Sequence, residues 1–189
     1  MSDTKTDINL AGQFLIAMPG MGDPRFERSV IYMLSHDGEG AMGFIVNRPT
    51  DGLNLGEIAS NLPDNVKETG LRNLPVFVCG PVQPENGFVL YSIDAAETKT
   101  QDGFVGVTQG LDILVQAAAG KGPQYMRLVL GYAGWGPGQL ESEIQENAWL
   151  IVEAEIGDVF AGDSSGLYKK LIGKLGIDIA KLSHSGGEA

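Results

Sequence analysis

The sequence is poor in the residues that most often build covalent or metal-bound scaffolds. Its 189 residues include one cysteine, Cys79, and two histidines. A single cysteine cannot form an internal disulfide, which fits a reducing compartment. These residues are also too few for a zinc site made of cysteine and histidine, and no ligand spacing is visible. We therefore expect no disulfide, no metal and no cofactor, and Cys79 is interpreted as a small buried residue.

Basic residues and long apolar runs are scarce as well. Thirteen lysines and arginines face 24 acidic residues, which gives a formal net charge of −11. Such a surface repels nucleic-acid phosphates and anionic membranes. No apolar run approaches the roughly 20 residues that span a bilayer, and the N-terminus lacks the basic-then-apolar order of a signal peptide. The sequence predicts a soluble cytoplasmic protein with no membrane contact and no direct DNA binding.

Glycine, in contrast, is abundant. The 27 glycines are scattered through apolar segments, and 43% of the residues are hydrophobic. Because the glycines follow no period, collagen-like and linker structures are excluded. The length fits one domain. We expect a single domain over residues 8–182, with mobile tails at 1–7 and 183–189.

Short runs rich in valine, isoleucine and aromatic residues predict a strand-rich fold. The expected strands cover residues 13–18, 29–35, 41–47, 76–79, 88–92, 104–107, 125–130 and 149–152. The turn at 36–40 predicts a hairpin between the second and third strands. A turn at 83–87 predicts another hairpin, between 76–79 and 88–92.

Apolar spacing predicts helices at 53–62, 111–119, 139–147 and from Asp163 or Ser164 to Leu175. The first helix is expected to face inward through Leu55, Ile58, Ala59 and Leu62. Gly120 is expected to end the second helix in a left-handed conformation. Residues 64–73 are polar and predict a loop.

The segment from Gly131 to Gly138 carries glycines around two large aromatics, Tyr132 and Trp135. Glycines allow sharp bends and close backbone approach, while aromatics supply rigid contact area. The segment therefore predicts either a concave site or a tight packing corner. Because Glu141 and Glu143 begin the helix that follows, they disfavour a phosphate there.

Four blocks together give the sequence a family resemblance. They read Ala-Met-Pro (17–19), Asp-Pro-Arg-Phe (23–26) and Ser-Val-Ile-Tyr (29–32); His36, Gly-Ala-Met-Gly (40–43) and Val-Asn-Arg-Pro (46–49); Cys-Gly-Pro-Val (79–82) and Gly-Phe-Val-Leu (87–90); and Gly-Tyr-Ala-Gly-Trp (131–135), Gly-Gln-Leu-Glu (138–141) and Asn-Ala-Trp-Leu (147–150). In this order they resemble the AlgH/YqgE family of bacterial proteins, whose biochemical function is largely unassigned.

The resemblance implies an α+β fold: one domain with a mixed, mostly antiparallel sheet curled toward a pseudo-barrel, and about three to four packed helices. It also carries a label, because one member is named as a regulator of alginate gene expression. It supplies no catalytic residues. Two positions depart from the family pattern: Cys79 replaces the first glycine of Gly-Gly-Pro, and Tyr91 stands where many members have histidine.

Three functional hypotheses remain open. The sequence favours a non-enzymatic regulatory module that binds a protein partner or a small ligand. The alternatives are an enzyme with a pocket near residues 131–135, and a transcriptional regulator. The lysines at 169, 170 and 174 are too few for a DNA-binding surface. The candidate binding residues are His36, Asn47, Gly80, Pro81, Tyr132, Trp135 and Gln139.

One motif resembles a hydrolase signature. Residues 162–166 read Gly-Asp-Ser-Ser-Gly, and Asp178 and His184 follow in hydrolase order. The motif requires a long buried strand before the serine, and only Val159 and Phe160 precede it here. Helix capping by Asp163 or Ser164 explains the same residues without chemistry.

Overall fold

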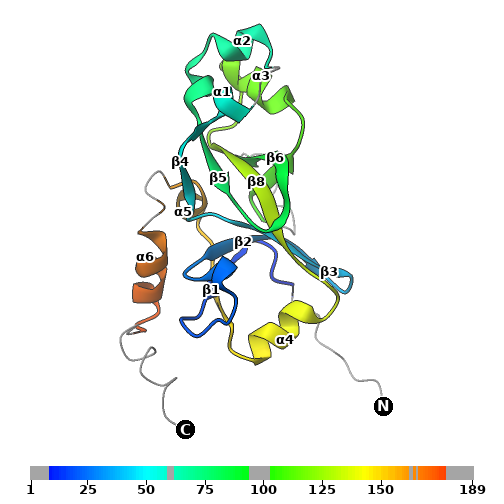
Figure 1. The fold of residues 1–189 in the computed structure, drawn as a ribbon, viewed down its shortest axis with the longest axis vertical. Coiled ribbons are helices and arrows are strands. Elements are labelled where there is room, and N and C mark those ends of the chain that lie inside the picture. Colours follow the sequence, from blue (N-terminus) through cyan, green and yellow to red (C-terminus); the bar gives the residue numbers. More distant parts are fainter. Residues whose placement is uncertain (1–8, 59–61, 94–102, 162–163, 165, 178–189) are drawn as a thin grey trace.

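A computed structural model describes residues 9–58, 62–93, 103–161, 164 and 166–177. The chain forms one α+β domain around a mixed sheet that is bent but not closed into a barrel (Figure 1). The strands are β1 (Gln13–Ala17), β2 (Val30–Asp37), β3 (Gly40–Ile45), β4 (Pro49–Asn54), β5 (Pro75–Val78), β6 (Val82–Ser92), β7 (Val105–Thr108), β8 (Met126–Trp135) and β9 (Trp149–Glu153).

The helices are short. They are α1 (Leu55–Ile58), α2 (Asp64–Lys67), α3 (Asp112–Ala118), α4 (Gln139–Gln145), α5 (Ile156–Val159) and α6 (Leu167–Lys174), with 3₁₀ turns at Pro24–Phe26 and Gly70–Asn73. Helices α1 to α3 lie together at one end of the molecule, and α4 lies at the other (Figure 1). None of the helices in the described ranges is long and apolar enough to cross a membrane.

Strand β8 connects the two ends of the sheet. Its first half pairs with β5 in parallel and with β6 antiparallel, and its last residues pair with β3. The remaining order is β3-β2-β1-β9, with β4 beyond β5 and β7 beyond β6. Gly131 lies where the partners change, at φ 66°, and an added Cβ would lie 2.6 Å from the Gly80 carbonyl oxygen. Only glycine fits this crossing.

The hydrophobic core has three parts. On one face of the β1-β2-β3 region, Phe14, Tyr32 and Phe44 pack under α6. On the other face, Leu15, Ile31, Trp135 and Trp149 pack under α4. The third part lies under α1 to α3 and consists of Leu55, Leu62, Val66, Val76, Val89, Leu114 and Leu128. The first two parts follow from the period-2 alternation of strands buried on both faces.

Several sequence predictions are confirmed. The hairpin of β2 and β3 forms, with Asp37 paired to Gly40. Helix α3 buries Leu114, and Gly120 follows it at φ 71°. The α+β class with a curled mixed sheet is confirmed, although the described residues contain six short α-helices rather than three or four.

Other predictions are wrong. Strand β5 pairs with β4 and β8 and not with β6, so the second hairpin does not form. The expected turn at 83–87 is part of β6, and the expected loop at 64–73 contains α2 and a 3₁₀ turn. Leu53 and Asn54 belong to β4 and not to a helix, and within the described residues α1 covers Leu55–Ile58, with Ile58 37% exposed instead of buried. Ala59 and the predicted tails lie outside the described residues.

The glycine-rich segment is also not a corner over its whole length. Strand β8 continues through Tyr132 to Trp135, and the chain turns only at 136–138, where Gly138 has φ 73°. Of the glycines before this turn, Gly131 allows the close strand crossing, together with Gly80 on the neighbouring segment. An added Cβ on Gly80 would meet the carbonyl carbon of Tyr132 at 2.0 Å.

Candidate functional site

The residues predicted as a binding site do not all come together at one place. Asn47 acts as a clamp: its Oδ1 accepts from the Val30 amide at 2.8 Å, and its Nδ2 donates to the Arg28 carbonyl at 2.9 Å. This holds Arg28 in a left-handed conformation at φ 53°. Gly80 and Pro81 lie where the chain crosses β8 at Tyr132. These positions therefore have structural explanations.

His36 lies in strand β2 and is buried, which corrects its placement in the predicted turn at 36–40. The register of β2 shifts between Met33 and Ser35, so His36 faces the side covered by α4. Its Nδ1 accepts from the Leu10 amide at 3.3 Å, and its Nε2 lies 3.4 Å from Oε1 of Glu141. His36 thus connects the start of the domain to α4.

Trp135 and Gln139 meet at Glu143, on the same side as His36. Oε2 of Glu143 accepts from the Trp135 indole at 2.9 Å and from the Trp149 indole at 2.7 Å. Oε1 accepts from Nε2 of Gln139 at 2.9 Å. We call Trp135, Glu143 and Trp149 the indole clamp. Its carboxylate oxygens are already engaged, so the clamp is a packing device and not an open site.

Tyr132 lies on the opposite face of β8 from Trp135, because successive strand residues point to opposite sides. It packs edge-on against Phe88 with ring centroids 6.2 Å apart. Both Tyr132 and Trp135 are among the residues that line a shallow hollow of about 480 Å³, together with Asp37, Glu39 and Val82. The two aromatics of the glycine-rich segment therefore border one hollow, although their rings pack in different parts of the core.

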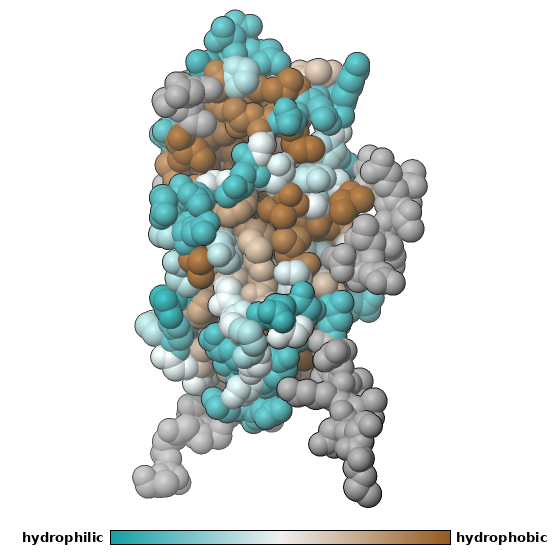
Figure 2. Space-filling view, turned by 90° about the vertical axis from the view of Figure 1, so that its right-hand side faces the viewer, coloured by the Kyte–Doolittle hydropathy of each residue, from teal (hydrophilic) through white to brown (hydrophobic). Residues whose placement is uncertain are grey.

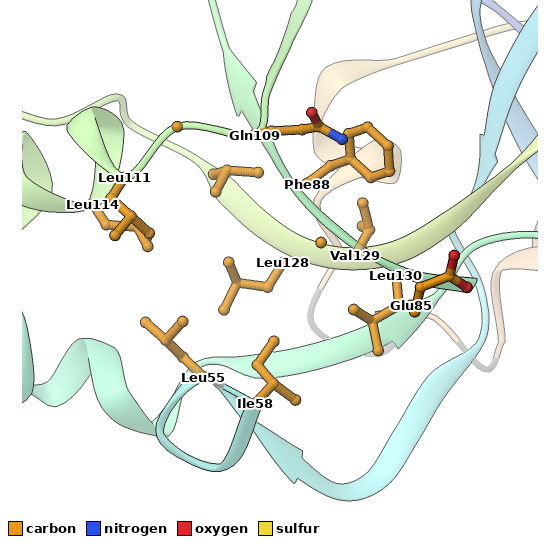
Figure 3. A pocket seen from close by; sticks show the side chains of 13 residues that line it. Leu55, Ile58, Glu85, Phe88, Gln109, Leu111, Leu114, Leu128, Val129 and Leu130 are labelled. Atoms are coloured by element: carbon orange, nitrogen blue, oxygen red, sulfur yellow. The ribbon is translucent and has the colours of Figure 1, made fainter. Parts of the chain in front are cut away.

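A different site lies at the α1–α3 end of the molecule. There, α1 and α3 form two walls above a floor made by β6 and β8, and they enclose a hollow of about 420 Å³ (Figure 3). We call it the leucine groove. It is lined by Leu55, Ile58, Glu85, Gly87, Phe88, Val89, Gln109, Gly110, Leu111, Leu114, Leu128, Val129 and Leu130. Figure 2 shows hydrophobic residues gathered in the upper half of the molecule, above a mostly hydrophilic lower half.

The local sequence explains this groove. Leu128 and Leu130 alternate along β8 and share one face. Leu55 is fixed because its amide donates to the Leu74 carbonyl at 3.0 Å. Gly87 leaves space on the floor, since an added Cβ would only reach ordinary contact with Leu130 at 3.8 Å. Ile58 and Leu111 are 37% and 41% exposed and stand at the rim.

Polar groups are confined to the edge of the leucine groove. Glu85 is exposed and is the sole charged side chain among the described lining residues, and Gln109 extends toward Phe88 (Figure 3). An irregular stretch of β6 displays Glu85: the register shifts between Val82 and Gly87, and Gln83 has φ 48°. Such bulges often re-aim side chains beside binding sites. No residue predicted from the sequence as a site lines this groove.

Arg127 is a buried cation behind the floor. Its guanidinium lies 4.0 Å from the Phe77 ring centroid and donates to the carbonyls of Val46 at 2.5 Å and Ala161 at 2.7 Å. Burial lowers the pKa of Arg127 to about 10. Burial also raises the pKa of the fully buried Cys79 thiol, so Cys79 is protonated and not a nucleophile, as its position predicts.

The hydrolase motif lacks its required context. A helix, α5, and not a strand, precedes Ser164. Ser164 is buried, and α6 begins at Leu167 after Gly166 without a side-chain cap, so the predicted capping by Ser164 is wrong. Asp163, Asp178 and His184 lie outside the described residues. Within the described ranges, no cluster of three or more histidine, cysteine or acidic side chains could hold a metal.

The fold and the groove define an α+β domain on one bent mixed sheet, with an apolar hollow at one end and a closed aromatic core at the other. The chain belongs to the AlgH-like family, whose model matches residues 14–180.

A UPF0301 protein of Ruegeria pomeroyi is 47% identical over 186 residues, which cover 96% of this chain and 100% of that protein. A UPF0301 protein of Paraburkholderia phymatum is 42% identical over the full length of both.

Solved structures agree with this assignment. The solution structure of the AlgH protein from Pseudomonas aeruginosa matches with a TM-score of 0.72 and 35% identity, covering 100% of this chain and 98% of that one. A crystal structure of a Corynebacterium diphtheriae protein matches with a TM-score of 0.70 at 23% identity, covering 92% and 91%. The second likeness concerns the fold alone.

Proposed function

We propose that this protein is a non-enzymatic binding module, and that the leucine groove receives an apolar group of its partner or ligand. The observation that carries the proposal is an open hollow of about 420 Å³ walled by leucines and rimmed by exposed Ile58 and Leu111. Its volume lies within the roughly 300–1,000 Å³ of typical ligand sites. Exposed apolar surface framed by polar residues marks interaction sites.

The character of the lining favours binding over catalysis. Catalysis by general acid–base or nucleophilic chemistry needs a polar group with a second group to activate or orient it. Among the described lining residues, Glu85 and Gln109 are the polar side chains, and both stand at the edge of an apolar surface. Such a surface is suited to recognition by shape and hydrophobicity.

The charge pattern supports an indirect rather than a DNA-binding role in regulation. Two of the three lysines of α6 are paired with acidic groups: Lys170 with Asp158, and Lys174 with Glu155 at 2.8 Å. These pairs reduce the positive charge available for phosphates. The regulatory name of one family member is therefore better explained by contact with another component than by operator recognition.

The test is to fill the groove. Gly87→Leu adds a side chain to the floor without backbone strain, since its φ is ordinary and its neighbour is the flexible end of Leu130. Gly20→Leu is the matched control because nothing lies within 4 Å of its added Cβ. Nile red, a neutral dye whose fluorescence rises in apolar surroundings, is titrated against each folded protein.

We expect Gly87→Leu to weaken dye binding at least about tenfold, because the filled volume excludes the ring system, while Gly20→Leu binds like the wild type. Circular dichroism and melting temperature show that each variant is folded. Equal dye affinity for wild type and a folded Gly87→Leu would rule out the groove as the binding site.

A further inference from the structure

The mouth of the leucine groove carries negative charge. Glu85 is exposed at its edge, and no lysine, arginine or histidine is among the described lining residues. Asp112, in the first turn of α3, lies close by. Its Oδ2 is 3.7 Å from the position that a Cβ added to Gly110 would take, and Gly110 lines the groove. An anionic ligand such as a fatty acid would meet this charge, whereas a cationic group would be attracted.

The floor of the groove disfavours an extended peptide that adds a strand. Strand β8 is paired with both β5 and β6 along the groove, and β6 is paired with β7 over Val89–Ser92. Before Val89 the edge of β6 is irregular, because its register shifts between Val82 and Gly87, and such a bulge blunts a strand edge. A peptide lying in this apolar hollow must satisfy its own backbone hydrogen bonds, and a helix does so.

The rim favours a macromolecule over a small molecule. A pocket for a small ligand buries most of that ligand's surface. Here the apolar surface continues outward through Ile58 on one wall and Leu111 on the other, and both side chains remain more than one-third exposed. An amphipathic helix could cover both rim residues while one of its side chains enters the hollow between them.

We propose that the leucine groove binds an amphipathic helical segment of another protein, with leucine-like side chains on its apolar face and a lysine or arginine that lies beside Glu85. This inference rests on the proposed binding function and specifies its partner. The apolar contacts supply most of the affinity, and Glu85 selects charge and orientation. Because Glu85 is exposed, its contribution is modest and decreases with salt.

The probes are three fluorescein-labelled helical peptides of equal length. One has leucines at i, i+3, i+4 and i+7 with lysines at one end. The second replaces the lysines by glutamates, and the third replaces the leucines by serines. Binding is followed by fluorescence anisotropy at about physiological salt. The proteins are wild type, Glu85→Gln, Glu85→Lys, Gly87→Leu, and Glu153→Lys as a control for net charge on distant strand β9.

We expect the leucine–lysine peptide to bind wild type at least about tenfold more tightly than the serine peptide, and Gly87→Leu to abolish that difference. Glu85→Gln should weaken binding of the lysine peptide about two- to fivefold. Glu85→Lys should reverse the preference in favour of the glutamate peptide. Glu153→Lys should leave the preference unchanged.

Two results would overturn the inference. If Glu85→Lys and Glu153→Lys change lysine-peptide binding equally, the effect is one of net charge and Glu85 does not select the partner. If no peptide binds while Nile red still distinguishes Gly87→Leu from wild type, the groove takes a small ligand, and the proposed function stands without a helical partner. If Nile red binds wild type and folded Gly87→Leu equally, both the proposed function of the groove and its helical partner are ruled out.

Discussion

The two ends of strand β8 are built in opposite ways. At the α4 end, Trp135 is buried, and the indole clamp satisfies the polar atoms of both tryptophans. Phe26 packs against the same rings, with centroids 6.5 Å from Trp135 and 5.7 Å from Trp149. At the α1–α3 end, leucines of the walls and floor leave a hollow open. One end is filled and hydrogen-bonded, and the other keeps apolar surface available.

The helices reflect the same contrast. Helix α2 has four residues, too few to be stable without tertiary packing. Helices α1 and α2 are held by core residues such as Leu55 and Val66. Binding surfaces often come from parts of a protein with lower local stability. The aromatic, glycine-rich segment thus contributes to stability, while the leucines at the other end line the groove that we propose as a binding site.

The largest expected effect is at the closed end. Trp135→Ala should lower the free energy of unfolding by about 3–5 kcal/mol, because it removes a large buried ring and leaves Glu143 with one indole partner. Urea denaturation measures the change. Tyr125→Ala, at an aromatic that is 37% exposed, is the comparison and should cost clearly less. Equal costs would mean that Trp135 does not anchor a filled end.

The second prediction separates the contribution of the Glu143 carboxylate to stability from that of the packed indole rings. Glu143→Leu leaves two indole N–H groups without their acceptor, and should cost about 2–3 kcal/mol. Glu143→Gln keeps one carbonyl oxygen and should cost less, about 1 kcal/mol. Both values come from denaturant titration. If both variants are as stable as wild type, the clamp owes its stability to ring packing alone.

The third prediction concerns alkaline pH in the filled core. Burial raises the pKa of Tyr32 to about 12, and its hydroxyl has no hydrogen-bond partner of good geometry in the described ranges, although the Phe104 and Val105 amides lie near it. As pH rises from 10 to 12, the unfolded chain loses this proton before the folded one, so stability decreases. The decrease should reach about 2 kcal/mol.

Tyr32→Phe removes that titration. The difference in unfolding free energy between wild type and Tyr32→Phe, measured from pH 9 to 12, should therefore change in favour of the variant as pH rises. A difference that is constant over this range would show that Tyr32 titrates alike in the folded and unfolded states.

The smallest expected effect is at the open end. Leu111→Gln should change stability by no more than about 0.5 kcal/mol, because Leu111 is 41% exposed. It should nevertheless reduce Nile red binding, since it makes one rim of the groove polar. Leu114→Ala, three residues further along and buried within α3, should cost about 2–5 kcal/mol. A similar loss for both leucines would mean that Leu111 is part of the core.

The sequence predicted the local features well. Turn residues and alternation identified the β2–β3 hairpin, and leucine spacing with Gly120 identified α3. It missed the short helices α2 and α5, because four-residue helices carry almost no periodic signal. It also missed β4, whose proline, aspartate, glycine and asparagine are uncommon in strands. It also joined Val76 and Phe88 in a hairpin, because nearness along the chain is only a weak guide to strand pairing.

The candidate site could not be predicted from local patterns in the sequence. From the sequence alone follow a single α+β domain, a buried inert Cys79 and the family itself, since these depend on residue type and ordered motifs. Only the tertiary structure turned His36 inward, because one extra residue in β2 reverses which face it points to. Likewise, only the packing of α1 and α3 over β8 brought Leu55, Leu111 and Leu128 around one groove, because contacts between residues distant in sequence depend on strand order and not on local propensity.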